Sequence, residues 1–144
     1  MISSFTDKYA FLSNFFESTV HFEGIEFPSS EAAFQAAKTA DMQLRREFCS
    51  LKPGQAKRKG RTIPLRAEWE AVKDSVMYRI VKAKFTQNAW LKRQLIATGD
   101  EYLEEGNTWH DNTWGNCTCP KCADIPGANR LGKILMRVRD ELRD

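Results

Sequence analysis

The segment FPSSEAAFQAAK at residues 27–38 can bring several reactive side chains onto one face of a helix. Pro28 and the two serines after it predict a helix start, because a serine hydroxyl can accept from a free N–H group of the first turn. Helical spacing then places four different side chains on one stripe, those of Glu31, Phe34, Gln35 and Lys38. The opposite stripe consists of alanines. A carboxylate in such a row can stabilise developing positive charge or activate water. The alternative is a solvated surface with one exposed Phe.

Three of the four cysteines crowd into the segment CTCPKC. In a cytosolic chain this crowding favours metal binding or a redox role over disulfides. A structural zinc site needs four ligands, so Cys117, Cys119 and Cys122 are one short, and either His110 or Cys49 could supply the fourth. A zinc ion held in this way would have a structural role, because a closed thiolate site leaves no open position. The alternative is a set of buried or free thiols.

Basic residues are concentrated between Lys52 and Arg66, where KPGQAKRKGRTIPLR contains no acid. Such a segment attracts phosphate groups, on a nucleotide or on a nucleic acid. The alternative is a solvated basic face that binds nothing.

The elements that carry these residues follow from periodicity. Apolar residues alternate around Glu23-Gly24 in TVHFEGIEFP, which predicts a β-hairpin immediately before the helix that begins near Ser29 and runs to about Ala40. A second helical stretch covers MQLRREFCSL, and Pro53-Gly54 is expected to end it.

Two longer helices are predicted from the 3.6-residue period. The first runs from about Glu68 to Thr86, with an apolar stripe of Trp69, Val72, Val76, Ile80 and Ala83. The second is capped by Asn129 and carries Leu131, Ile134, Leu135, Val138 and Leu142. Between them, Asn88 can cap a helix that buries Leu91 and Leu95 and stops at Gly99. The segment EYLEEGNTWHDNTWG is expected to form a second small β element or an ordered loop.

Length and composition predict one domain over residues 1–144, because 42% hydrophobic content is ordinary for a globular chain of this size. The predicted fold class is α+β, dominated by helices, with one or two short β-hairpins. The first residues lack the features of a signal peptide, and no run of about 18 apolar residues occurs. We therefore expect a cytoplasmic protein without a membrane partner.

Six segments, in order along nearly the whole chain, resemble the NADAR (YbiA-like) family of N-glycosidases. They are FLSNFF, FPSSEAAFQAAK, Gly60-Arg61, EWEAVKDSVMYRIVKAKF, DNTWG and NRLGKILMRVRDEL. The resemblance implies a YbiA-like fold and hydrolysis of the N-glycosidic bond between ribose and a nitrogenous base, with no cofactor needed for catalysis. The substrates it implies are ribosyl phosphates of riboflavin synthesis, ADP-ribose or NAD-like compounds, and ADP-ribosylated guanine in nucleic acid.

The resemblance also implies site residues. The active-site Glu of the family falls on Glu31, the aromatic residue of its WE motif on Trp69, and its acid before WG on Asp111. We expect Glu31 to stabilise the sugar cation and activate water, and Asp111 to hold ribose hydroxyls or share proton transfer. Trp69 would stack on the base, the alternative being a core Trp. Both acids should then surround one sugar-sized hollow walled by the indole.

Other polar and aromatic side chains are expected to contact the substrate. Amides suit ribose hydroxyls or base edges, and cations suit phosphate. Trp114 is expected mainly to support the Asp111 loop, and Arg130 is a further phosphate candidate. With Trp69, the expected substrate-binding set is Asn14, Phe15, Lys38, Arg61, Trp114 and Asn129.

The sequence departs from the family pattern in two places. Ala32 and Ala33 follow Glu31 where many members have a His and an aromatic residue, and NCTCPKCADIPGA follows WG where others have a short Gly-rich loop. The first departure affects the shape of the pocket, and the second affects the local scaffold. A second function is a nucleic-acid or nucleotide binding module that uses the basic segment and a zinc knuckle without catalysis, although a net charge of only +3 speaks against it.

Overall fold

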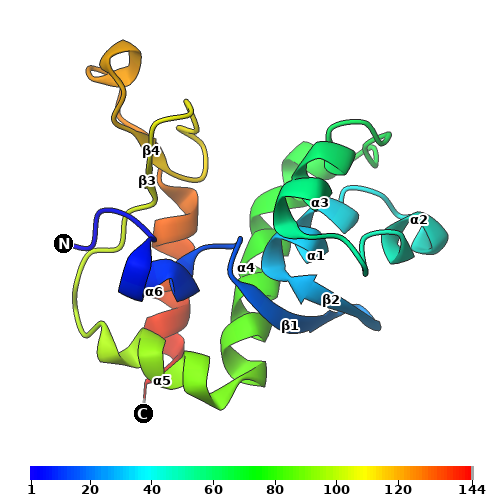
Figure 1. Cartoon of the computed structure of the whole chain (residues 1–144), viewed down its shortest axis with the longest axis horizontal. Coiled ribbons are helices and arrows are strands. Elements are labelled where there is room, and N and C mark those ends of the chain that lie inside the picture. The colour runs from blue at the N-terminus through cyan, green and yellow to red at the C-terminus, as the bar shows by residue number, and fades with distance from the viewer. Residues whose placement is uncertain (144) are drawn as a thin grey trace. The chain divides into compact units, whose positions relative to one another are not determined.

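A computed structural model describes residues 1–143 of the chain (Figure 1). Two compact units are present, a central unit of Asn14–Ala89 and a terminal unit of Met1–Ser13 with the residues from Trp90 on. The predicted α+β class is confirmed, because helices dominate and the strands form only two small pairs. The single domain over residues 1–144 stays a prediction.

The central unit begins with the predicted hairpin, formed by β1 (Glu17–Phe22) and β2 (Ile25–Ser29). The strands are antiparallel, with Val20 opposite Phe27. Glu23 and Gly24 connect them with positive φ angles of 49° and 83°. A two-residue turn with both φ angles positive matches the right-handed twist of the strands, which is why this pair of residues closes the hairpin.

The helix α1 (Ser30–Ala36) follows β2 directly and contacts both strands, α3 and α4. It ends four residues before the predicted limit at Ala40. Every residue of α1 is buried, so the interpretation of its mixed stripe as a solvated surface is wrong. The short helix α2 (Met42–Arg46) comes next and is capped by the Asp41 side chain.

The basic segment contains a helix that the sequence did not predict. Pro53 begins α3 (Pro53–Gly60) rather than ending the preceding helix. Proline is well tolerated in the first helical turn, because the N–H group that it lacks has no partner within the helix there. The Pro-Gly pair therefore marks a helix boundary, but that boundary is the start of α3 and not the end of the preceding helix.

The long helix α4 (Trp69–Gln87) matches the prediction within one residue at each end. Its buried face differs in part from the predicted stripe, because Val72 and Ala83 are only half-buried. Helix α4 packs on β1 and α1 (Figure 1), and its buried residues are Trp69, Val76, Met77, Ile80, Val81, Lys84 and Phe85.

The terminal unit contains the 3₁₀ helix η1 (Asp7–Leu12), most of α5 (Ala89–Ala97), and α6 (Arg130–Leu142). Leu91 and Leu95 are buried, as predicted, and the helix is followed by Gly99 with a φ angle of 66°. The apolar residues that α6 buries are Leu131, Leu135 and Val138, whereas Ile134 and Leu142 are half-buried.

The second β element is not a hairpin. The strands β3 (Gly106–Asn107) and β4 (Asn116–Cys117) pair in parallel, and the 3₁₀ helix η2 (Pro120–Cys122) follows them. Parallel strands require a longer connection than a hairpin turn. Residues 108–115 form this connection, and they include His110, Asp111 and Trp114. No helix among residues 1–143 is both long and apolar enough to cross a membrane.

Candidate functional site

Glu31 lies in the first turn of α1, where Ser29 and Asn14 hold the backbone. Ser29 caps the helix, and its hydroxyl accepts from the Ala32 N–H group at 3.1 Å. Asn14 accepts from the Glu31 N–H group at 3.1 Å through its backbone carbonyl, and from the Ser30 hydroxyl at 2.9 Å through its side chain. The Asn14 amide is buried and also donates to the sulfur of Met77 at 3.4 Å. Asn14 therefore positions Glu31.

Glu31 is 7% exposed. Its Oε1 atom accepts a hydrogen bond from Gln35 Nε2 at 2.9 Å, one turn further along α1. The Gln35 amide in turn lies against Gly60 at the end of α3, where a Cβ atom would overlap with Gln35 Oε1. The sequence predicted that Glu31 and Gln35 share a stripe, but only the packing of α3 on α1 reveals that Gly60 makes room for the amide.

Replacing Gly60 with Ala should therefore separate Gln35 from Glu31. A hydrogen bond to a charged group contributes about 1.5–3 kcal/mol, so we expect a loss of stability in that range and reduced turnover. The free energy of unfolding in urea and kcat/KM would be measured together. Gly54→Ala in the same helix is the matched control, because its Cβ would meet only Arg58 Nη1, at 3.9 Å. Equal effects of the two substitutions would contradict the role of Gly60.

Positive charges gather around Lys38, just beyond the end of α1. Burial lowers the pKa of Lys38, the Glu31 carboxylate raises it, and the charges of Arg61, Lys57 and Lys73 lower it again, so that the net shift is downward. Three cations that act electrostatically on Lys38 make this a place where an anion is favoured, although Lys73 is also paired with Glu70 at 2.6 Å. Lys38 and Arg61 stay predicted phosphate contacts, and we call Lys38, Lys57, Arg61 and Lys73 the cation cluster.

The rest of the basic segment is partly neutralised by acids from outside it. Lys59 pairs with Glu47 at 2.9 Å, and Arg66 pairs with Glu68 at 2.6 Å. The segment is therefore not a uniformly cationic face. Two of its residues, Lys57 and Arg61, belong to the cation cluster.

Trp69 does not present a stacking surface. Its side chain is 4% exposed and packs against Phe34, with ring centroids 5.2 Å apart and ring planes inclined by 53°. The expectation of a Trp69 wall for the base is thus wrong, and the alternative of a core Trp is correct. The reason is that α1 buries its Phe34 face against the start of α4. Phe15, by contrast, is 44% exposed and has Lys57 Nζ 5.7 Å from its ring centroid, so it can receive a base.

The sequence reasoning overlooked Lys84. This lysine is 1% exposed on the buried face of α4, and burial lowers the pKa of its amine to about 7. Its Nζ atom lies 5.7 Å from the ring centroid of Phe16 and 5.1 Å from that of Phe85. A strongly shifted pKa marks a candidate functional residue. A signal existed in the sequence, because Lys84 follows Ile80 by four residues and therefore lies on the apolar stripe.

Asp111 belongs to the terminal unit, in the connection between β3 and β4. Its Oδ1 atom accepts from the N–H groups of Thr113 at 3.0 Å and Trp114 at 2.9 Å, so the carboxylate organises its own loop. The bond to Trp114 comes from its backbone, so the supporting role of the Trp114 side chain stays a prediction. That Asp111 and Glu31 surround one hollow stays a prediction.

Asn129 is buried, and its side chain is occupied by the terminal unit. The amide donates to the carbonyl of Leu103 at 2.9 Å and to the Tyr102 hydroxyl at 3.3 Å, and its oxygen accepts from the Glu105 N–H group at 3.0 Å. The side chain makes no capping bond, although Asn129 stands at the N-cap of α6 with a φ angle of 50°. Both expectations for Asn129, as a side-chain cap and as a substrate contact, are corrected to a structural role.

The cysteine segment forms a cluster with His110 in the terminal unit. Of the two candidates for a fourth member, His110 is the one that the structure places with Cys117, Cys119 and Cys122, whereas Cys49 belongs to the central unit. All four cysteines are free thiols.

Comparisons with known proteins give a consistent result. The NADAR domain model matches residues 3–143. The chain is 39% identical over 142 residues to the N-glycosidase YbiA of Escherichia coli, covering 96% of this chain and 85% of that protein. It is 34% identical to an N-glycosidase of Nostoc punctiforme, covering 94% and 87%. It is 37% identical to a riboflavin biosynthesis protein of Vibrio vulnificus, covering 96% of this chain and 37% of that protein. The NMR structure of E. coli YbiA matches with a TM-score of 0.82 and 38% identity, covering 98% of this chain and 82% of that one.

Proposed function

Because this chain belongs to the NADAR family, we propose that it hydrolyses the C–N bond between ribose and a nitrogenous base in a phosphorylated substrate. It is a hydrolase that acts on N-glycosyl bonds, as its N-glycosidase relatives are. The phosphorylated ribosyl substrate and the roles of the residues are the proposal. The observation that carries it is a buried carboxylate, Glu31, beside the cation cluster.

Glu31 is suited to stabilise the transition state. Breaking the ribosyl C–N bond leaves positive charge on the sugar, and a fixed carboxylate favours that charged state more than the neutral ground state. The hydrogen bond from Gln35 holds the carboxylate in place without neutralising it. In the proposed reaction water adds to the anomeric carbon, Glu31 accepts the proton of that water, and the base leaves with the bonding electron pair and takes up a proton. None of these steps needs a cofactor.

The cation cluster would bind the phosphate group. Lys38 and Arg61 are the expected contacts, since charge-assisted hydrogen bonds to phosphate are strong and Arg can bind in a bidentate manner. Phe15 would receive the base, because it is the aromatic residue of the expected set that is exposed and lies beside a member of the cluster. Base stacking on an aromatic ring contributes roughly 1–3 kcal/mol.

Replacing Arg61 with Gln tests the phosphate contact. We expect KM for a phosphorylated substrate to rise about tenfold or more, since loss of one charge-assisted contact costs about 1.5–3 kcal/mol. The value of kcat should change less, because the phosphate is remote from the bond that breaks. Arg46→Gln is the control, as Arg46 is an exposed cation of α2 in the same unit. A KM equal to that of the control variant would contradict the contact.

Two substrate classes remain within this proposal. The name of the Vibrio vulnificus relative supports a ribosylamino intermediate of riboflavin synthesis. The family resemblance also supports ADP-ribose derivatives such as ADP-ribosylated guanine in nucleic acid. The deciding experiment incubates the protein with ADP-ribosylated DNA, NAD, ADP-ribose and a riboflavin-pathway ribosylamine, and identifies products by mass spectrometry. The proposal would be contradicted if none of these compounds released a base and a ribose product.

The second function, nucleic-acid binding without catalysis, has less support. The N-glycosidase relatives favour hydrolysis, and the pairs Lys59–Glu47 and Arg66–Glu68 reduce the charge available to a nucleic acid. It would require DNA or RNA binding that falls steeply with salt and no turnover on the panel. We further propose the cytoplasm as the location, in keeping with four free thiols.

A further inference from the structure

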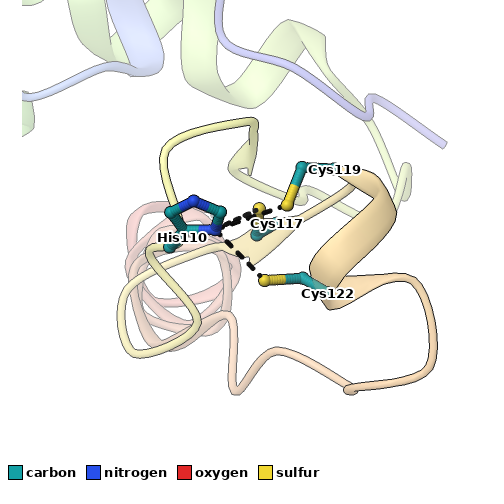
Figure 2. Close-up of side chains that lie close together, drawn as sticks. All are labelled: His110, Cys117, Cys119 and Cys122. Atoms are coloured by element: carbon teal, nitrogen blue, oxygen red, sulfur yellow. Dashed lines mark hydrogen bonds between the residues drawn. The ribbon is translucent and has the colours of Figure 1, made fainter.

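Four side chains that bind transition metals converge in the terminal unit (Figure 2). Cys117 comes from β4, Cys119 and Cys122 lie before and at the end of η2, and His110 comes from the connection between β3 and β4. Their ligand atoms all lie within 4.8 Å of one another. Cys117 and Cys122 are buried, Cys119 is half-buried, and His110 is exposed. Figure 2 shows that the Nδ1 atom of His110 faces all three sulfur atoms.

The spacing of these atoms agrees with a tetrahedral zinc site. Zinc binds sulfur at about 2.3 Å and imidazole nitrogen at about 2.0–2.1 Å, so tetrahedral angles place the nitrogen about 3.6 Å from each sulfur. His110 Nδ1 lies 3.3 Å from Cys119 Sγ, 3.4 Å from Cys122 Sγ and 3.9 Å from Cys117 Sγ. These distances bracket the expected value. A small shift of each side chain would satisfy all four bonds.

The side-chain amides of Asn107, which is buried, and Asn112, which is half-buried, hold the backbone around the cluster. The oxygen of the Asn107 side chain accepts from the N–H groups of Trp109 and Asp111, at 3.3 and 3.1 Å, and its amide donates to the Asp111 carbonyl at 2.8 Å. These bonds hold the residues on both sides of His110, which has a φ angle of 70°. Asn112 Oδ1 accepts from the Cys117 N–H group at 2.8 Å. The ligands are therefore pre-positioned by their neighbours.

We propose that His110, Cys117, Cys119 and Cys122 bind one zinc ion, and that this ion fixes the loop carrying Asp111. Three thiolates and one imidazole in tetrahedral arrangement are a typical ligand set of structural zinc. Four protein ligands leave no position for water or substrate, so the ion is structural. The ion can fix Asp111 because Asp111 directly follows the ligand His110 in the chain. The Asp111 carboxylate in turn accepts hydrogen bonds from the backbone N–H groups of Thr113 and Trp114.

Metal binding can be measured without any assay of activity. The protein would be purified in reductant, freed of metal with a chelator and titrated with Zn²⁺, with bound metal counted by mass spectrometry and Co²⁺ used as a spectroscopic substitute. We expect one zinc ion per chain and the absorption of tetrahedral, thiolate-bound cobalt. Cys119→Ser should weaken zinc binding at least about 100-fold, more than the loss of an outer-sphere partner does. Cys49→Ser is the matched control and should bind zinc as the parent does.

Hydrogen exchange of the parent protein is a second measurement, and it does not depend on whether a variant folds. Zinc added to the metal-free parent should slow exchange over residues 107–123 and leave α4 unchanged. The proposal is overturned if the parent binds no stoichiometric zinc, if Cys49→Ser weakens binding as much as Cys119→Ser, or if bound zinc leaves exchange over residues 107–123 unaltered. Since turnover is not measured, failure of this site would leave the N-glycosidase proposal unaffected.

Discussion

Glu31→Gln is expected to fold like the parent protein and to lose turnover by roughly 10²–10³-fold, the cost typical of removing one preorganised electrostatic group. The substitution keeps the shape of the side chain and removes its charge. The replacement amide can still accept from Gln35 Nε2 through its oxygen, so the local hydrogen bond can persist. What the variant lacks is the negative charge that stabilises the sugar cation and the carboxylate oxygen that accepts the proton of water.

The measurement is kcat on whichever compound of the panel the parent hydrolyses, with the free energy of unfolding as the test of folding. Glu26→Gln is the control, because Glu26 is an exposed carboxylate of β2 in the same unit. It should retain the parent rate. Unchanged release of base and ribose product by Glu31→Gln would remove Glu31 from the mechanism.

Lys84→Met is expected to stabilise the protein at pH 7 by about 2 kcal/mol or more. Burial lowers the pKa of the Lys84 amine from an ordinary value of 10.5 to about 7, so the folded protein disfavours the charged form. Each pKa unit corresponds to about 1.4 kcal/mol, and part of the gain is offset by the contacts that the amine loses, among them those with the rings of Phe16 and Phe85.

The pH dependence of the free energy of unfolding tests whether the lowered pKa of Lys84 causes this stabilisation. Between pH 7 and 10.5 the unfolded chain keeps the Lys84 proton and the folded chain loses it, so the free energy of unfolding of the parent should rise with pH in this window. Below pH 7 both states are protonated, and this group contributes no further slope. The difference in unfolding free energy between Lys84→Met and the parent should shrink as pH rises from 7 to 10. Lys52→Met, at an exposed lysine of the same unit, should leave the slope unchanged. A constant difference across this range would refute the assignment.

Lys84 also shows where sequence reasoning is limited. Its position on the apolar stripe of α4 follows from the helical period, but a long amine at such a position can extend to solvent as easily as remain inside. The sequence leaves the burial of Trp69 open in the same way, but here the side chain expected to be exposed is the buried one. The start of a helix could expose an indole, and only the packing of Phe34 on it shows that the ring is part of the core.

Several features followed from the sequence by itself, namely the β1–β2 hairpin, the extent of α4, the start of α1 and the three cysteines that cluster with His110. Each depends on a local property, such as a two-residue turn, a 3.6-residue period, a capping hydroxyl or adjacent thiols. Tertiary structure decided the burial of both faces of α1, the place of Gln35 against Gly60, the choice of His110 over Cys49 and the parallel pairing of β3 with β4. These depend on contacts between segments far apart in the chain, and the energy of such contacts is set by complementary shape and charge that local patterns do not encode.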